Sequence, residues 1–159
     1  MSRTKIWIFV GAFLVLATGA ILAIVVNQPT ETEKYSPTHK TFLPKNKNIN
    51  DLGGWQRISP PDKEPVFAFS DKINETQISV SQQAMPEEFN KDPEKSVEEL
   101  AKNENATNIF SIETLKIYTG TSAKGPQTVI FFKDGTLVFI KSQGVIEESD
   151  WVDYIKNLE

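Results

Sequence analysis

Side chains able to do chemistry are gathered in one short stretch of small and polar residues, 120–127. Its candidate functional residues are Gly120, Thr121, Ser122, Lys124, Gly125 and Gln127. The two glycines have the spacing of a phosphate-binding loop, but Pro126 and Gln127 stand where that loop needs Lys and Ser or Thr, and no helix is expected to follow. Ser122 and Lys124 are too close along the chain for a Ser–Lys catalytic dyad. We therefore predict an exposed loop between two strands.

Most familiar catalytic centres are excluded by composition. The chain has no Cys, which removes thiolate nucleophiles, Cys-ligated zinc and Fe–S clusters, and its only His, His39, lies between two prolines ahead of the expected folded region. Glu147, Asp150 and Asp153 share a helix face and could hold an acid and a base or a divalent cation, but they lie opposite the apolar stripe of that helix. We expect a solvated face there, and no catalytic residue, metal or cofactor.

The charge of the chain is divided between its two parts. Residues 1–50 contain six Lys/Arg and two Asp/Glu, whereas residues 51–159 contain eleven Lys/Arg and nineteen Asp/Glu, a net charge of −8. Binding to nucleic acid needs a basic face that displaces counterions from phosphates, and no part of 51–159 has one. We therefore expect no nucleic-acid partner.

A run of 21 apolar residues, 6–26, has the length and composition of a membrane-spanning helix. A cleavable signal peptide is the alternative, because Ala17 to Ala20 offers small residues at a cleavage position. Six further apolar residues, 21–26, follow that position and exceed the usual apolar region of a signal peptide. We therefore favour an uncleaved signal-anchor, a single span integral to the cell membrane.

The basic residues Arg3 and Lys5 precede the expected span, and none follows it directly, which predicts a cytoplasmic N-terminus. Prolines and polar residues predict a flexible linker after the span. The expected organisation is a short cytoplasmic N-terminus at 1–5, a transmembrane helix at 6–26, a flexible linker at 27–50 and an extracytoplasmic α+β domain at 51–159.

Patterns of apolar residues predict the elements of that domain. They indicate an entry strand or a packed lead-in at 55–58 and strands near 66–69, 76–81, 128–132 and 136–140, with one or two short strands in 109–118. They also indicate an internal helix from Asp92 and Pro93 to about 103–105 and a C-terminal helix that begins at 147–149. The expected architecture is α+β, with an antiparallel sheet of about five strands, one internal helix and one C-terminal helix.

The strongest local signal is a hairpin around Asp134-Gly135. A two-residue turn places Phe132 opposite Leu137, so that Val129, Phe131, Val138 and Ile140 share one face and Ile130, Phe132, Leu137 and Phe139 the other. Both faces are apolar and need a cover. If both helices lay on one side, the set Val129, Phe131, Val138 and Ile140, or the opposite set, would form a binding surface for a protein, peptide or lipid. Closure of that face by long loops is the alternative.

The order of these elements resembles an uncharacterised family of single-span bacterial envelope proteins. The resemblance is carried by Gly54-Trp55, 66–69, 78–83, the helix at 97–101, Tyr118-Thr119-Gly120, 125–131 and the closing helix at 151–155. The chain is also distantly similar to the extracytoplasmic sheet domains of anti-sigma-factor-like and lipoprotein-carrier-like proteins. The carrier-like relatives imply that an apolar group binds against the sheet.

These features together favour a membrane-anchored extracytoplasmic binding or assembly module of the bacterial cell envelope that is not an enzyme. Two alternatives remain open. One is a small envelope hydrolase with a Ser or carboxylate site, and the other is an accessory subunit of a larger membrane complex. The pattern of residues does not specify the partner or the oligomeric state.

Overall fold

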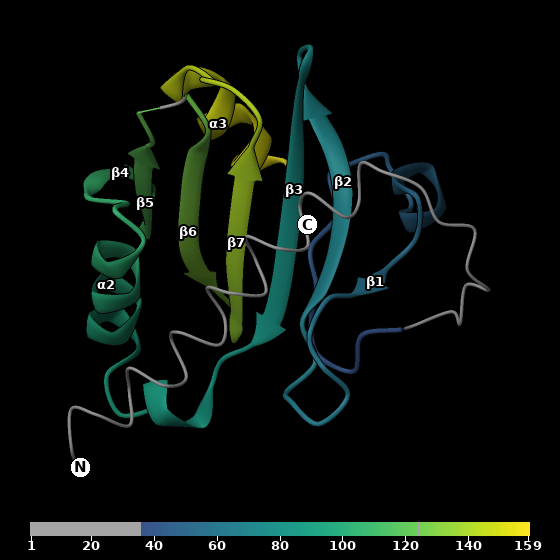
Figure 1. Cartoon of the computed structure of the whole chain (residues 1–159), viewed down its shortest axis with the longest axis vertical. Coiled ribbons are helices and arrows are strands. Elements are labelled where there is room, and N and C mark those ends of the chain that lie inside the picture. The colour runs from purple at the N-terminus through teal and green to yellow at the C-terminus, as the bar shows by residue number, and fades with distance from the viewer. Residues whose placement is uncertain (1–35, 124) are drawn as a thin grey trace.

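Seven strands form one antiparallel sheet in residues 36–123 and 125–159, the part of the chain that the computed structural model describes. The strands are β1 (Gln56–Arg57), β2 (Phe67–Ile73), β3 (Thr76–Ala84), β4 (Asn108–Ile112), β5 (Leu115–Thr121), β6 (Gln127–Lys133) and β7 (Thr136–Ser142). Their order in the sheet is β1-β2-β3-β7-β6-β5-β4 (Figure 1). The expected α+β class is confirmed, but the expected count of about five strands was too low. The lead-in pairs with β2, and a turn divides 109–118 into two strands.

The β6–β7 hairpin has the predicted register, with Phe132 opposite Leu137. Its turn residues Asp134 and Gly135 both have positive φ, 46° and 83°. Two positive φ values are the geometry in which the twist of a two-residue turn matches that of its strands. The apolar residues of the hairpin therefore alternate between two faces of the sheet as expected.

Helix α2 (Pro93–Asn103) begins where the sequence predicts. The Asp92 side chain caps it by accepting a hydrogen bond from the backbone N–H of Lys95, and Pro93 occupies the first turn. Its buried side chains are Val97, Leu100 and Ala101, which belong to the same apolar cluster as Tyr118, Ile130, Leu137 and Phe139. We call this side of the sheet the α2 face.

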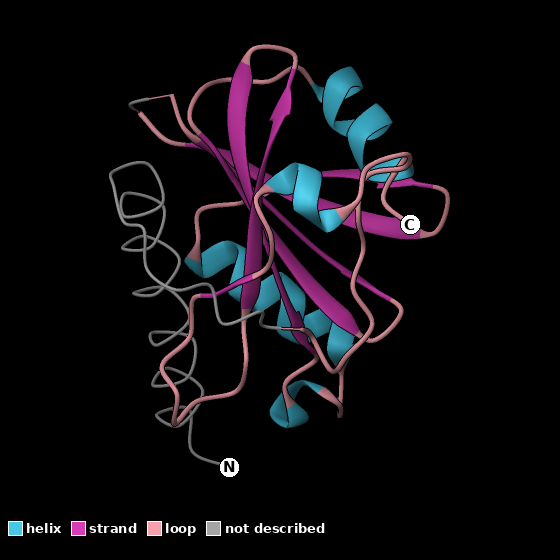
Figure 2. Ribbon diagram, turned by 90° about the vertical axis from the view of Figure 1, so that its right-hand side faces the viewer, coloured by secondary structure: helices cyan, strands magenta, loops and turns pink. Residues whose placement is uncertain are grey.

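Helix α3 (Glu148–Lys156) covers the other side of the sheet, which we call the α3 face. Trp151 and Ile155 are its buried side chains and pack in one cluster with Val129, Phe131, Val138 and Ile140. The two helices therefore lie on opposite faces (Figure 2). Each face of the hairpin has a helix to cover it, so the arrangement that would have left one face open does not occur.

An extended segment, residues 40–45, crosses the α3 face, and we call it the strap. Phe42 is only 1% exposed and lies within the core of this face. The backbone N–H and C=O of Leu43 both bond to the backbone of Glu159, at 2.9 and 3.0 Å. The predicted linker at 27–50 was therefore too long at its C-terminal end, because Phe42 and the C-terminus hold the strap against the sheet.

The strap leads into a short 3-10 helix, η1, and then into β1, and a second 3-10 helix, η2, follows later in the chain. Helix η1 (Ile49–Leu52) carries a capping box at Asn48 and buries Leu52, whereas η2 (Glu87–Phe89) lies between β3 and α2. The expected span at 6–26 and residues 27–35 of the expected linker lie outside the described residues. Among the residues that are described, no helix is long and apolar enough to cross a membrane.

Candidate binding notch

A pocket of about 900 Å³ opens at the end of the sheet where the β4–β5 and β6–β7 hairpins part. The pairing of β5 with β6 stops at Ile117 and Phe131. The β4–β5 pairing continues to Ile112 and Leu115, and the β6–β7 pairing continues up to the turn that begins at Asp134. The two hairpin ends therefore project past the last shared pair and leave a gap, which we call the notch.

Apolar side chains make the inner wall of the notch. They are Val97, Ile112, Leu115, Tyr118, Phe132 and Ile155. Val97 belongs to the core of the α2 face and Ile155 to the core of the α3 face. Val97 and Ile155 are only 2% and 1% exposed, so the half-buried Leu115 and Phe132 supply most of the apolar surface that the notch offers.

Charged side chains line the rest of the notch in equal numbers of each sign: Lys91, Asp92, Glu94, Glu113, Lys116, Lys133, Asp134 and Lys156. Most of them have partners within the fold. Lys116 lies 2.8 Å from Glu94, Asp134 lies 2.6 Å from Lys40 of the strap, and Lys133 donates to the carbonyl oxygen of Leu158 at 2.7 Å.

Three charged side chains of the notch have no partner in the described part of the chain. Lys91 lies just before α2, Glu113 lies in the β4–β5 turn, and Lys156 lies at the end of α3. All three are exposed. The rim of the notch thus presents two cations and one anion that are free to meet charges on another molecule.

Tyr118 adds a neutral hydroxyl to the notch. Burial raises the pKa of its phenol, and the negative charge of Glu98 raises it further. The hydrogen bond and charge of Glu94 also raise the pKa of Lys116, which therefore stays protonated. At neutral pH the notch combines an apolar wall, a phenol that can donate a hydrogen bond and fixed charges of both signs.

This set of groups suits binding. Thr114 and Tyr118 carry the hydroxyls among the lining residues, and neither hydroxyl bonds to a general base within the described part of the chain. The carboxylate of Glu94 is bonded to Lys116. An apolar wall with a few placed polar groups is the usual composition of a ligand pocket.

The expected binding surface on the hairpin lies elsewhere, inside the core. Val129, Phe131, Val138 and Ile140 are each 0% exposed. The side chains that pack with them include Trp151 and Ile155 of α3 and Phe42 of the strap. The four residues therefore fill the centre of the α3 face and present no surface to a ligand in this structure.

The expected functional loop, residues 120–127, proves to be a hairpin connection with two anchoring residues. Gly120 lies against the connection that follows α2, and an added Cβ there would be 2.1 Å from the carbonyl oxygen of Asn105. Gln127 fastens β6 to the start of α3, because its Oε1 accepts from the backbone N–H of Ile146 at 2.7 Å and from Nε1 of Trp151 at 3.1 Å. Both residues therefore hold elements together.

The other residues of that loop lie at the opposite end of β5 and β6 from the notch. Thr121 and Ser122 are exposed, Gly125 has a φ of 98°, and Ser122 and Gly125 take part in a tight turn through backbone hydrogen bonds. Lys124 lies outside the described residues. The structure does not bring this loop together with the notch.

A buried ion pair on the α2 face was not predicted. Glu104 at the end of α2 lies 3.5 Å from Nζ of Lys141, which donates to Oγ1 of Thr128 at 2.6 Å. The Oε1 atom of Glu104 is buried and has no hydrogen-bond partner among the described residues, and burial raises the pKa of this carboxyl. The sequence predicts one contact of this cluster, because the expected hairpin register places Thr128 opposite Lys141.

The notch residues were missed for a different reason. Lys91, Glu113 and Lys156 are far apart along the chain, and only the point at which β5 stops pairing with β6 brings them together. No periodicity of a single strand or helix carries that information. Comparisons of the chain with protein-family models, with curated proteins and with solved structures found no match.

Proposed function

We propose that the protein is a membrane-anchored extracytoplasmic binding or assembly module of the bacterial cell envelope, that it is not an enzyme, and that the notch is its binding site. The observation that carries this proposal is the composition of the notch. The half-buried side chains of Leu115 and Phe132 lie there beside three charged groups that have no partner among the described residues. Such a site can take an extended protein segment that has both apolar and charged side chains.

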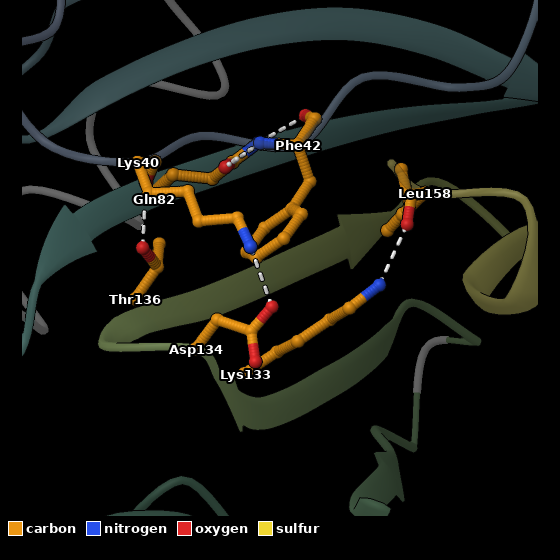
Figure 3. Close-up of polar contacts among 7 residues, drawn as sticks. All are labelled: Lys40, Phe42, Gln82, Lys133, Asp134, Thr136 and Leu158. Carbon is orange, nitrogen blue, oxygen red and sulfur yellow. Dashed lines mark hydrogen bonds and ion pairs between the residues drawn. The ribbon is translucent and has the colours of Figure 1, made fainter.

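The strap supports the same proposal through its position. Near the start of the described chain, next to His39 packed on Phe67, Lys40 pairs with Asp134 on the wall of the notch (Figure 3). The part of the chain that we expect to be anchored in the membrane therefore joins the sheet at the end that carries the notch. A partner held in the same membrane would meet this end of the domain, so we expect that partner to be another envelope protein.

A photo-crosslinking experiment tests this proposal in native membranes. Thr114 lines the notch and is exposed, so a benzophenone amino acid in its place keeps the fold and faces any bound segment. Thr121 provides the matched control, because it is also an exposed Thr of the same hairpin region but lies at the other end of β5. We expect one discrete crosslinked product from position 114 and none from position 121.

Charge reversal makes the test specific to the notch. The double change Lys91→Glu and Lys156→Glu removes both free cations without breaking a contact of the described fold. The product from position 114 should fall by about tenfold, which corresponds to about 1.4 kcal/mol of lost binding. Equal amounts of crosslinked product from positions 114 and 121 would rule out the notch as the binding site. So would an amount of product from position 114 that the double change leaves unaltered.

A further inference from the structure

The two edge strands of the sheet differ in how well they are protected. At one edge, β1 is two residues long, and Arg57 binds the carbonyl oxygens of Pro60, Pro61 and Lys63 beside it. At the other edge, β4 is five residues long and has no Pro and no charged residue. Proteins usually shorten, charge or cover an edge strand to prevent pairing with other chains. Strand β4 has none of these features.

The outward backbone groups of β4 follow from its register with β5. Ile112 and Leu115 flank a two-residue turn, and such a pair is hydrogen-bonded. Because antiparallel pairs alternate, Phe110 also bonds to β5, whereas Ile109 and Ser111 direct their N–H and C=O groups away from it. These two residues have no backbone partner in the described part of the chain.

The side chains of β4 also suit an interface. Ile109 is 58% exposed and is one of two exposed large apolar residues in the described chain. The stretch 105–112 contains no charged side chain, so a copy of itself would meet it without repulsion between like charges. An exposed apolar side chain on an unprotected edge is a typical feature of strand pairing between chains.

We propose that β4 pairs with β4 of a second copy of this chain in antiparallel orientation, with Phe110 opposite Phe110. This register overlaps the whole strand and places Ile109 opposite Ser111 twice, which satisfies all four outward groups of each copy. The two Ile109 side chains become diagonal neighbours on the α2 face, about 7–8 Å apart, within contact range for long side chains. The two sheets join into one continuous sheet.

A second copy fits this edge better than a foreign strand because the edge is complementary to itself. The same five uncharged residues supply both the donors and the acceptors when the strand is turned by the two-fold axis. The axis runs perpendicular to the sheet and places both α2 helices on one side. A strand pair of this length buries less area than a permanent dimer, so the pairing is a weak one that concentration in a membrane favours.

The natural absence of Cys allows a direct test with the full chain in native membranes. In the proposed register, the two Phe110 side chains form a pair that is not hydrogen-bonded across the interface, with a Cβ separation that suits a disulfide. Phe110→Cys should therefore give a disulfide-linked dimer on mild oxidation. Gln56→Cys, an exposed position on the other edge strand, should give none.

Two further variants keep the test decisive. Ile109→Cys removes no core contact and should be joined to its copy by a short bis-maleimide even if Phe110→Cys folds poorly. Adding Ser111→Pro to either variant removes the outward N–H donor of residue 111 in both copies, so the yield of dimer should fall about tenfold. Ser111→Ala keeps that N–H and should leave the yield unchanged.

The possible results separate the proposal from its rivals. Absence of a dimer from both Phe110→Cys and Ile109→Cys would overturn it, as would equal crosslinking from Gln56→Cys. A product with the mass of a different protein at β4 would show that a foreign strand occupies the edge. An unchanged yield of crosslinked dimer after Ser111→Pro would show that the two copies do not pair through the backbone of β4.

Discussion

Phe42 and Gln82 are joined by two hydrogen bonds that hold the strap on the sheet. The backbone N–H of Phe42 donates to Oε1 of Gln82 at 2.8 Å, and Nε2 of Gln82 donates to the carbonyl oxygen of Phe42 at 2.7 Å. The amide of Gln82 thus satisfies both backbone groups of a residue that is 1% exposed. A single side chain near the C-terminal end of β3 therefore supplies the two hydrogen bonds that a neighbouring strand would otherwise give to the strap.

Replacing Gln82 with Ala should lower the free energy of unfolding of residues 36–159 by about 2–4 kcal/mol, because two buried backbone groups lose their partners. Gln77→Ala on the same strand is the control, since the Gln77 side chain makes no hydrogen bond in the described structure, and its effect should stay within about 0.5 kcal/mol. Urea unfolding followed by Trp fluorescence measures both. Equal effects of the two changes would contradict the structural role of Gln82.

Gly120 should tolerate no side chain. An added Cβ would lie 2.1 Å from the backbone oxygen of Asn105, so the connection between α2 and β4 would have to move, and Gly120→Ala should destabilise the fold by about 3 kcal/mol or more. Gly144→Ala is the matched control, because its nearest neighbour would be the Thr76 side chain at 3.7 Å, an ordinary contact. Thermal unfolding of the two variants should differ clearly. A stable Gly120→Ala variant would show that the close contact of Gly120 with Asn105 is not needed by the fold.

Glu104 should make the fold more stable as the pH falls. Its folded-state pKa is raised by burial, so the folded protein holds the proton more tightly than the unfolded chain does. The stabilising contribution is complete below the unfolded pKa of about 4.5 and is lost as the pH rises through the raised folded-state pKa. Subtracting the unfolding free energy of Glu104→Gln from that of the natural protein should give a difference that grows on acidification.

The comparison of these two proteins also controls for His39. Burial lowers the pKa of that imidazole, so it opposes the effect of Glu104 by weakening the fold as the pH falls below about 6.5. His39 is present in both proteins, and its contribution cancels in the difference. A difference that is independent of pH between 4 and 7 would show that Glu104 keeps an ordinary pKa.

The expected membrane topology can be checked with the same Cys-free background. Ser122→Cys, in the exposed turn between β5 and β6, should react with a membrane-impermeant maleimide in intact spheroplasts, whereas Ser2→Cys should react only after lysis. Labelling of Ser2→Cys from outside would reverse the predicted orientation. A mature N-terminus near Ala20, found by mass spectrometry, would replace the anchor with a cleaved signal peptide.

Local signals in the sequence predicted the elements that depend on neighbouring residues. Asp92 and Pro93 mark the start of α2 because a cap and a first-turn proline act within one turn of the helix. The Asp134-Gly135 turn sets the β6–β7 register because two residues determine the geometry of the whole hairpin. Both predictions are confirmed by the structure.

Features that depend on distant residues were missed. Phe42 lies in a polar stretch with prolines, so its burial was not expected, and it becomes clear only when Gln82 and the C-terminal residues are placed around it. The notch exists because one strand pair ends earlier than its neighbours, and no single strand encodes that difference. The choice of opposite faces for α2 and α3 is likewise a property of the assembled sheet.

The strap also determines how the domain would respond to mechanical force. A pull on the chain ahead of residue 36 acts on the packing of His39 against Phe67 and on the Lys40–Asp134 ion pair, then on the Phe42–Gln82 hydrogen bonds, and then on the pairing of Leu43 with Glu159. These contacts would break one after another as the strap peels away, and the seven strands would not yet carry any tension. Once released, residues 40–45 would add to the length of the expected linker, and the sheet would stay folded while the strap extends.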